Sequence, residues 1–267
     1  MAKNDKPSSL HHYTSMSTLV ALFNGISKDP NEENSPFYFT FHATNAFQMN
    51  DKKEGCMLLD KFFTESEIKT QYKETYSQIV REEGEIHLIS LCRSNTDSKD
   101  LGLIPMWNMY GGDGGGAILV FDFDKLQKYI EQQSDAFLQE CEYKSLSEIN
   151  EFIKDINAKI KGEKDKKAFL SSLRLEAFRQ KNKYWKQENE WRIVVKSKDE
   201  KLKMSNNRVV SYTEVRIPVN CLSDIIIGPL VEIEPVKRIL ENTISKLRKS
   251  DDKIEDIHVK PSKLQIR

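Results

Sequence analysis

The chain has 267 residues, with 41 basic and 41 acidic side chains and therefore no formal net charge. Apolar residues make up 38% and charged residues 31%, which is typical of a globular protein and excludes a disordered one. The charge balance does not point to nucleic acid or a membrane surface, although it leaves room for a local basic patch.

The sequence shows no motif of a membrane helix, a signal peptide or a metal site. No apolar run approaches the roughly 18 residues of a membrane helix, and the first ten residues contain no apolar stretch of signal-peptide length. The four cysteines form no CxxC pair, and the five histidines show no HExxH or HxxxH spacing. We therefore expect a cytoplasmic protein with no membrane contact and no metal.

The first half of the chain combines helix and strand patterns. Ser15 and Ser17 precede an apolar stripe with helical spacing, which predicts a capped helix. The run GAILVFDFD at 116–124 is almost continuously apolar, as in a buried strand, and Asp122 or Asp124 is placed to cap the next helix. Further predictions are strands over 35–45 and 85–93, a loop over 50–55 and helical residues over 58–82.

The second half is predicted to contain a long charged helical stretch followed by closely spaced strands. The stretch runs from about 145 to 183 and should break near Gly162. Pro235 lies near the first turn of an amphipathic helix over 234–247. Strands are predicted over 137–143, 190–197, 208–219, 223–229 and 256–261.

Helices and strands alternate without the regular order of βαβ units. We therefore expect an α+β fold with a largely antiparallel sheet. The whole chain, residues 1–267, is predicted to form a single domain, with a helical insertion at about 145–183.

Two stretches in the middle of the chain allow a structural or a functional interpretation. Five glycines surround Asp113 in MYGGDGGGAILVF, but a P-loop needs Gly-Lys-Ser/Thr opening a helix, and this loop enters a strand. Two interpretations of this glycine-rich stretch therefore remain: a plain connecting loop, or a loop whose backbone approaches a ligand closely. Just before it, Trp107 and Tyr110 share a helical face, either as core aromatics or as a stacking wall for a planar ligand.

The stretch KYWKQENEWRIVV, from Lys183 to Val195, places Glu188 and Glu190 two residues apart before an apolar strand. In extended chain the two carboxylates would share a face and repel each other. They could be surface ion pairs with Lys183, Lys186 or Arg192. They could also be partly desolvated carboxylates, set between Trp185 and Trp191 and tuned for catalysis.

Five motifs are spread along the chain: HYTS at 12–15, Asn-Asp at 50–51, MWxxYG at 106–111, WxxExEWRI at 185–193 and the strand end IIGP at 226–229. Together they resemble a bacterial family of uncharacterised domains related to ADP-ribosyltransferases. The resemblance implies an ADP-ribosyltransferase-like fold, in which a split antiparallel sheet with surrounding helices holds NAD in a cleft.

The same resemblance implies an NAD-dependent mono-ADP-ribosyltransferase with NAD as co-substrate. Glu190 would be the catalytic acid and Glu188 the upstream acid that orients the target. The cofactor-binding residues would be His12, Tyr13, Thr14, Ser90, Trp107 and Tyr110. Two departures stand out: the usual Ser-Thr-Ser-like motif is not clear, and the helical insertion has no obvious counterpart.

The residue types suit this chemistry. Cleavage of the nicotinamide–ribose bond passes through an oxocarbenium-like centre, as in glycoside hydrolysis. A fixed carboxylate stabilises that charge, and a second carboxylate accepts a proton from the attacking group. An NAD glycohydrolase would use the same cleft with water as acceptor, and a catalytically inactive member would only bind a nucleotide or a partner.

The acceptor is suggested by local charge. Between residues 159 and 186 there are ten Lys or Arg and three acids, which could steer a phosphate backbone or simply form a solvated helical face. Related transferases include toxin–antitoxin and phage-defence effectors, some of which modify mRNA. RNA is therefore the favoured acceptor, with DNA or a protein as open alternatives, and an antitoxin or chaperone is a candidate partner. The substrate-side residues would be Arg192, Lys164, Lys166 and Lys167.

Overall fold

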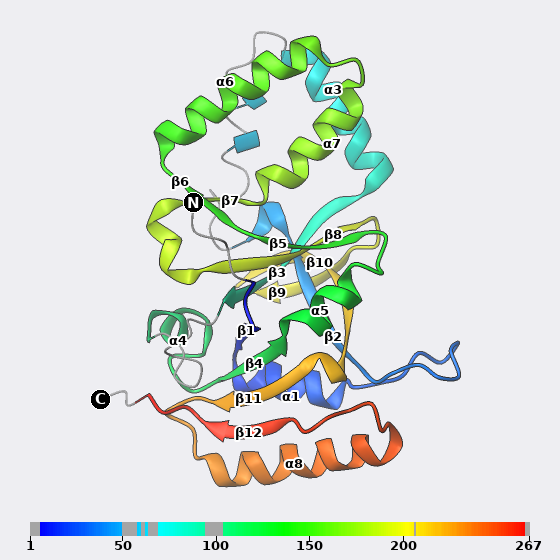
Figure 1. The fold of residues 1–267 in the computed structure, drawn as a ribbon, viewed down its shortest axis with the longest axis vertical. Coiled ribbons are helices and arrows are strands. Elements are labelled where there is room, and N and C mark those ends of the chain that lie inside the picture. Colours follow the sequence, from blue (N-terminus) through cyan, green and yellow to red (C-terminus); the bar gives the residue numbers. More distant parts are fainter. Residues whose placement is uncertain are drawn as a thin grey trace. The chain divides into compact units, whose positions relative to one another are not determined.

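Figure 1 shows a computed structural model of the chain. It describes residues 6–49, 58–59, 62–63, 69–93, 104–205 and 207–264, so the predicted loop at 50–55, the Asn-Asp motif and Cys56 lie outside the described residues. The chain divides into two compact units. Unit 1 comprises Met1–Phe41, Leu91–Gln132 and Glu214–Arg267, and unit 2 comprises His42–Ser90 and Gln133–Thr213.

Unit 1 contains a mixed sheet with the strand order β12-β11-β4-β1-β3. β1 (Ser9–Thr14) pairs antiparallel with β4 (Ala117–Asp122) and with the end of β3 (Glu85–Arg93). β11 (Leu222–Ile227) pairs antiparallel with β4 and parallel with β12 (His258–Pro261). The inner position of β4 explains its apolar run, because its first five residues are all buried.

Two helices of unit 1 begin at side chains that the sequence marks as caps. The Ser15 side chain accepts a hydrogen bond from the backbone N–H of Thr18, and Asp122 accepts one from Lys125 at 2.9 Å, so one of the two candidates is confirmed as the cap of each helix. The helices of unit 1 are α1 (Met16–Asn24), α4 (Ile104–Tyr110), α5 (Phe123–Ile130), the 3₁₀ turn η4 (Val219–Cys221) and α8 (Ile233–Ser250).

Unit 2 takes its strands from widely separated parts of the chain. β8 pairs antiparallel with β5 from Ala136↔Val195 to Glu140↔Trp191, and it also pairs with β3. β10 pairs antiparallel with β9, and β6 pairs parallel with β7. The bounds are β2 (Tyr38–Asn45), β5 (Ala136–Glu140), β6 (Glu142–Lys144), β7 (Gln180–Asn182), β8 (Glu190–Ser197), β9 (Lys201–Ser205) and β10 (Arg208–Pro218).

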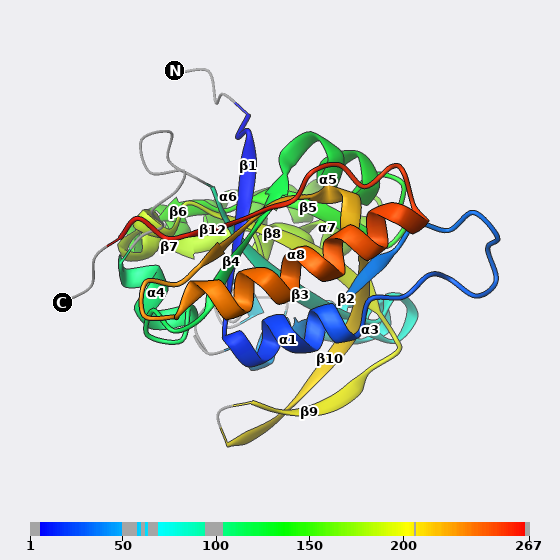
Figure 2. The same ribbon diagram turned by 90° about the horizontal axis from the view of Figure 1, so that it is seen from below.

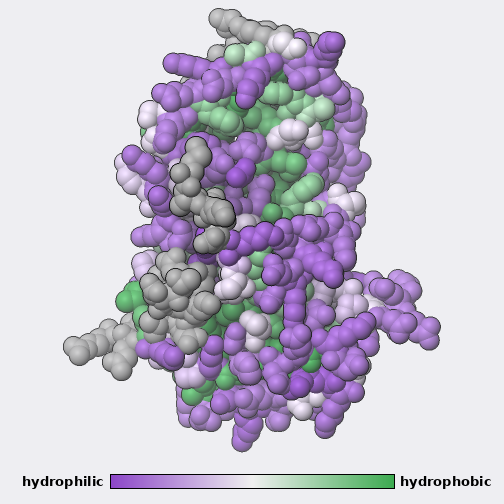
Figure 3. Space-filling view, viewed as in Figure 1, coloured by the Kyte–Doolittle hydropathy of each residue, from purple (hydrophilic) through white to green (hydrophobic). Residues whose placement is uncertain are grey.

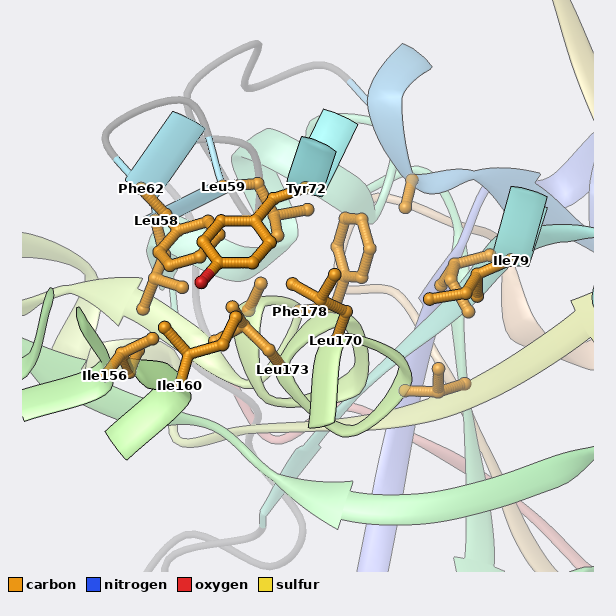
Figure 4. Close-up of a cluster of buried hydrophobic side chains, with 14 of the residues drawn as sticks. Leu58, Leu59, Phe62, Tyr72, Ile79, Ile156, Ile160, Leu170, Leu173 and Phe178 are labelled. Carbon is orange, nitrogen blue, oxygen red and sulfur yellow. The ribbon is translucent and has the colours of Figure 1, made fainter. Parts of the chain in front are cut away.

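The predicted helical insertion forms much of the core of unit 2. Figure 4 shows Ile156, Ile160, Leu170, Leu173 and Phe178, all from the insertion, in one buried cluster with Leu58, Leu59, Phe62, Tyr72 and Ile79. The helices of unit 2 are η1 (Ala46–Gln48), α3 (Lys69–Glu83), α6 (Leu146–Gly162), α7 (Lys166–Ala177) and η3 (Lys183–Glu188). The insertion is therefore a structural part of unit 2.

The predicted α+β class is confirmed, and the helix break near Gly162 lies where it was expected. The single strand predicted over 137–143 is two strands, β5 and β6, and β9 was not predicted. The predicted helical stretch also ends earlier than about 183, because α7 stops at Ala177 and β7 follows at Gln180–Asn182. Within the described residues, no helix combines the length and the apolar character needed to span a membrane.

Candidate functional site

Four charged side chains meet inside unit 2. Lys181 comes from β7, Glu188 from the end of η3, and Glu190 and Arg192 from the start of β8. Each of the four is at most 3% exposed. Lys181 Nζ donates to a carboxylate oxygen of Glu188 and to Glu190 Oε2 at 2.6 Å. We call these four residues the charge cluster.

Arg192 holds Glu190 by two hydrogen bonds. Its Nε lies 2.8 Å from Glu190 Oε1 and its Nη2 lies 3.0 Å from Oε2, while Nη1 donates to the backbone carbonyl of Phe178 at 2.9 Å. Because Arg192 follows Glu190 by two strand positions, both side chains leave β8 on the same face. This forked geometry is among the strongest charge-assisted contacts in proteins.

Glu188 and Glu190 are brought together by a reversal of the chain between them, and not by a shared strand face. Glu188 ends a 3₁₀ helix and lies outside the strand, so the two acids do not both lie in extended chain, which is the condition under which they would share a strand face. Asn189 between them has φ 42° and ψ 51°, a left-handed conformation that asparagine tolerates better than most residues. This reversal brings both carboxylates to one ammonium group.

Aromatic side chains border the charge cluster. The Trp185 ring centroid lies 5.9 Å from Lys181 Nζ, a cation–π distance. The backbone N–H of Glu190 donates to Tyr143 Oη at 2.7 Å. Burial raises the pKa of the Tyr143 phenol, so this residue is neutral at physiological pH. Trp185 is therefore a neighbour of the charge cluster through Lys181.

Glu190 is ionised despite its burial. Burial alone would raise the pKa of its carboxyl, but the charges of Arg192 and Lys181 and their hydrogen bonds outweigh that effect and lower the pKa from 4.5 to about 2. Two carboxylates face two cations, so the charge cluster is neutral as a whole. Both acids are bound to Lys181 and almost fully buried, so contact with a ligand requires a rearrangement around them.

The predicted substrate role of Arg192 does not agree with its position. The side chain is fully buried, and its hydrogen bonds run to Glu190 and Phe178. The sequence suggested a surface residue because arginine is rarely buried unless it is paired. Here the partner is Glu190. Arg192 therefore orients and stabilises that carboxylate, and it is too deeply buried to contact a substrate in this arrangement.

The basic stretch at 159–186 does not form one basic surface. Arg174 and Lys181 are buried, and Arg179 forms an ion pair with Glu142 at 2.9 Å. Figure 3 shows hydrophilic side chains along the visible sides of α6 and α7, with apolar side chains between them. This pattern fits the alternative of a solvated helical face.

The three lysines predicted on the substrate side differ in their surroundings. Lys167 forms an ion pair with Glu82, and Lys166 Nζ lies 5.8 Å from the Tyr72 ring. Lys164 is exposed, in the turn between α6 and α7. The sequence could not show that two of the three are engaged with α3, which is distant in the chain.

The predicted cofactor residues of unit 1 lie on β1 and α4. Tyr13 packs edge-on against Trp107, with ring centroids 5.4 Å apart, and Trp107 is fully buried. Trp107 is therefore a core residue here, and the interpretation as an open stacking wall is corrected. Tyr110 is 41% exposed, and Thr14 is buried.

His12 lies edge-on to Phe41 at 5.4 Å within unit 1. It is half-buried and shares a strand face with Thr14, since the two are two residues apart on β1. Ser90 belongs to β3 in unit 2, where it is half-buried. The structure thus brings Tyr13 and Trp107 together and places Ser90 in the same unit as the charge cluster.

The glycine-rich loop is explained by backbone packing. A Cβ on Gly116 would lie 2.1 Å from the carbonyl oxygen of Thr14, and one on Gly228 would lie 2.3 Å from that of Gly114. The N–H of Gly228 donates to the Gly116 carbonyl at 2.8 Å. Close contact between chain segments therefore accounts for these glycines without a ligand.

Sequence reasoning missed Lys181 and Tyr143. Lys181 stood in a basic run and carried no sign of burial, and Tyr143 is distant in sequence from the glutamates it adjoins. No group of three or more His, Cys, Asp or Glu among the described residues is placed to hold a metal ion.

A model of a family described as "Protein of unknown function (DUF2971)" matches residues 106–193, about a third of the chain. The matched span includes the MWxxYG motif and all four members of the charge cluster. No curated protein and no solved structure matches the chain. The similarity is thus to an uncharacterised family, and it carries no link to ADP-ribosyltransferases.

Proposed function

We propose that the chain is an NAD-dependent mono-ADP-ribosyltransferase whose catalytic acids are Glu190 and Glu188. As the bond between ribose C1′ and the nicotinamide nitrogen breaks, Glu190 stabilises the positive charge that develops on the ribose. Glu188 accepts the proton of the attacking group, which then forms the new bond to C1′.

The observation that carries the proposal is the convergence of both carboxylates on one cation. Lys181 Nζ lies 2.6 Å from Glu190 Oε2 and also binds Glu188, in surroundings with almost no solvent exposure. A ribosyl cation has the same unit charge as the ammonium. It could take that position once Lys181 withdraws, and in a low dielectric the carboxylates would hold it strongly.

The low pKa of Glu190 supports the same role. A residue that stabilises a cation has to be ionised, and against the effect of burial the pKa of this carboxyl is lowered first by Arg192 and then by Lys181, so Arg192 still favours the ionised form once Lys181 withdraws. Arg192 is then a positioning residue, since it fixes the orientation of Glu190 through two hydrogen bonds.

RNA is the proposed acceptor class, with a toxin or defence role and an antitoxin or chaperone as the proposed partner. The support is the basic composition of residues 159–186 and the exposed position of Lys164 within it. Lys166 and Lys167 belong to the same proposed surface, although both also contact α3.

A second function is favoured by the burial itself. Glu188 is 3% and Glu190 2% exposed, and the cations of the charge cluster neutralise both. Buried ion clusters of this kind also occur purely as structural elements. The chain would then be an inactive module that binds a nucleotide or a partner, with the charge cluster holding β7, η3 and β8 together.

The test is incubation of the purified chain with NAD labelled in its adenylate part, alone and with RNA, DNA or a cell lysate. Label transfer to RNA supports the proposal, and transfer to DNA or protein changes its acceptor. Release of free ADP-ribose would indicate an NAD glycohydrolase. If no NAD is consumed under any condition, the transferase proposal fails and the binding module is favoured.

A further inference from the structure

Gln139 lies on β5, the strand that pairs with β8 in unit 2, and the register places it opposite Arg192. Figure 2, like Figure 1, shows β5 alongside β8. Two residues further along β5, the Cys141 N–H donates to the Glu190 carbonyl at 2.9 Å. Residues directly opposite each other in a sheet point to the same face, with Cβ atoms about 4.5–5.5 Å apart. The Gln139 side chain therefore leaves β5 on the face that carries Arg192 and Glu190.

The side-chain amide of Gln139 is a buried donor without a partner. Its Nε2 is enclosed, and among the residues that the structure describes no group accepts a hydrogen bond from it. The two N–H groups on this nitrogen can only donate. A buried polar group left unpaired costs folding free energy, so a folded protein that keeps one has a reason for it, such as a molecule that binds there.

Gln139 spans the border between the charge cluster and solvent. The residue is half-buried, whereas Arg192 and Glu190 are almost fully buried. The unpaired Nε2 is on the enclosed side of the residue. A rearrangement that gives a molecule access to Glu190 would therefore also bring that molecule next to this donor.

The groups on this face select the chemistry of the molecule. A phosphate or carboxylate would add a third anion to a cluster in which two cations already neutralise two acids. An apolar group would leave Gln139 Nε2 unpaired. A hydroxyl donates and accepts at once, so its hydrogen can bind a carboxylate while its oxygen accepts from Gln139. The site therefore fits a hydroxylated, uncharged group such as a sugar.

We propose that Gln139 is a binding residue for this sugar, and that its Nε2 donates a hydrogen bond to a hydroxyl oxygen of the ribose next to nicotinamide. The inference rests on the proposed function for the identity of the ligand, and it adds a residue that recognises a ribose hydroxyl. A neutral amide interacts about equally with the ribose before and during bond cleavage. Gln139 should therefore lower the KM for NAD and leave kcat largely unchanged.

The test is calorimetric titration of the full chain with NAD, without an acceptor, for wild type, Gln139→Leu and Gln139→Glu. We expect both variants to bind at least tenfold more weakly, because leucine has no donor and a carboxylate can only accept. Gln78→Leu is the matched control, since Gln78 is exposed on α3 and its Nε2 already donates to Glu82 at 2.8 Å. This control should leave the affinity unchanged.

Urea unfolding without NAD reports on the unpaired donor itself. Gln139→Leu removes that donor, so the variant should unfold at a higher urea concentration than wild type. Gln78→Leu removes a donor that is paired with Glu82 and should give no such gain. A lower midpoint for Gln139→Leu would show that its amide already has a partner in the free protein, and would overturn the proposal.

Two NAD analogues separate a direct contact from a structural effect. Their nicotinamide ribose lacks either the 2′-hydroxyl or the 3′-hydroxyl. With the analogue that lacks the hydroxyl bound by Gln139, wild type and Gln139→Leu should bind equally, since the contact is absent in both. The proposal is overturned if Gln139→Leu binds NAD as tightly as wild type does. It is also overturned if the variant loses the same factor with NAD and with both analogues.

The outcomes for Gln139 and for the transferase are distinguishable. NAD that binds wild type through Gln139 but is never cleaved would remove the transferase and keep the binding residue. Cleavage by Gln139→Leu with the KM of wild type would keep the transferase and remove the binding residue. If wild type binds no NAD, both proposals are overturned.

Discussion

The ammonium nitrogen of Lys181 lies 2.6 Å from Oε2 of Glu190, and the same nitrogen also binds Glu188. This relationship links the proposed chemistry to the stability of unit 2. The acids that would stabilise a ribosyl cation are held in place by a lysine that occupies the position of that cation. Perturbing the charge cluster should therefore change both folding and NAD use, in ways that can be separated.

The first prediction concerns stability. Glu190→Gln removes the partner of both Arg192 and Lys181 and leaves buried cations under-compensated, which typically destabilises a protein by about 3–5 kcal/mol. The glutamine isostere keeps some hydrogen bonds, so we expect the lower end of that range in urea unfolding. Glu188→Gln should destabilise less, because Arg192 still neutralises Glu190 there. The reverse order would contradict the assignment of Arg192 to Glu190.

The second prediction concerns the loss of folding stability at acidic pH. The folded chain holds the pKa of Glu190 at about 2, below its ordinary 4.5. A depressed pKa stabilises the fold above pH 4.5, and that stabilisation disappears as the pH falls from 4.5 toward 2. The shift corresponds to about 3 kcal/mol. Urea titrations across this window should show a shallower loss of stability for Glu190→Gln than for wild type. Parallel curves would mean that Glu190 does not carry this pH dependence.

The third prediction concerns access to the acids. Lys181→Ala removes the cation that occupies the point between Glu188 and Glu190. If a ribose takes this position, the variant should bind NAD more tightly although it is less stable, and calorimetric titration at low temperature measures the binding. An unchanged or lost affinity in a variant whose circular dichroism is native would argue for a purely structural lysine.

The fourth prediction concerns the glycine-rich loop. Gly116→Ala would place a Cβ 2.1 Å from the Thr14 carbonyl, so β1 and the loop must separate and the melting temperature should fall clearly. Gly162→Ala is the matched control, because no atom lies within 4 Å of its added Cβ at the end of α6. It should be neutral or stabilising by up to about 1 kcal/mol. Equal effects of the two changes would refute the packing explanation.

The fifth prediction concerns RNA. Changing Lys164, Lys166 and Lys167 to Glu should weaken RNA modification and leave NAD binding intact, because charge reversal repels a phosphate backbone. The change at Lys167 also removes its ion pair with Glu82 and can lower stability. The single variant Lys164→Glu keeps that ion pair, so any loss of RNA modification in it reflects RNA binding. Lys237→Glu on α8 serves as the control. RNA modification at the wild-type rate in the triple variant would remove this surface from the proposal.

Much of the secondary structure could be predicted because its signals are local. The Ser15 and Asp122 caps, the apolar run of β4 and the break at Gly162 each depend on a few neighbouring residues. The strand β9 escaped prediction because it is short and alternates lysine with exposed apolar residues. Such a pattern is typical of an edge strand, and it lacks the buried face that usually marks a strand in a sequence.

The candidate site was predicted in part. The sequence pointed to Glu188, Glu190 and Trp185 as neighbours and offered Arg192 as an ion-pair partner of the glutamates, which is confirmed for Glu190. It also gave Arg192 a substrate role and overlooked Lys181. Burial of a charge depends on which partners tertiary packing brings together, and the strand β7 that carries Lys181 has only three residues. The Asn189 reversal, with φ 42°, also could not be inferred from strand alternation.

The most direct test of the central claim compares transfer of labelled ADP-ribose from NAD by wild type, Glu190→Gln and Glu241→Gln. Glu241 is an exposed acid on α8 and serves as the matched control. We expect transfer to RNA by wild type and Glu241→Gln, and a loss of at least a hundredfold in Glu190→Gln under conditions where it remains folded. Full activity in folded Glu190→Gln would contradict the assignment of the catalytic acid.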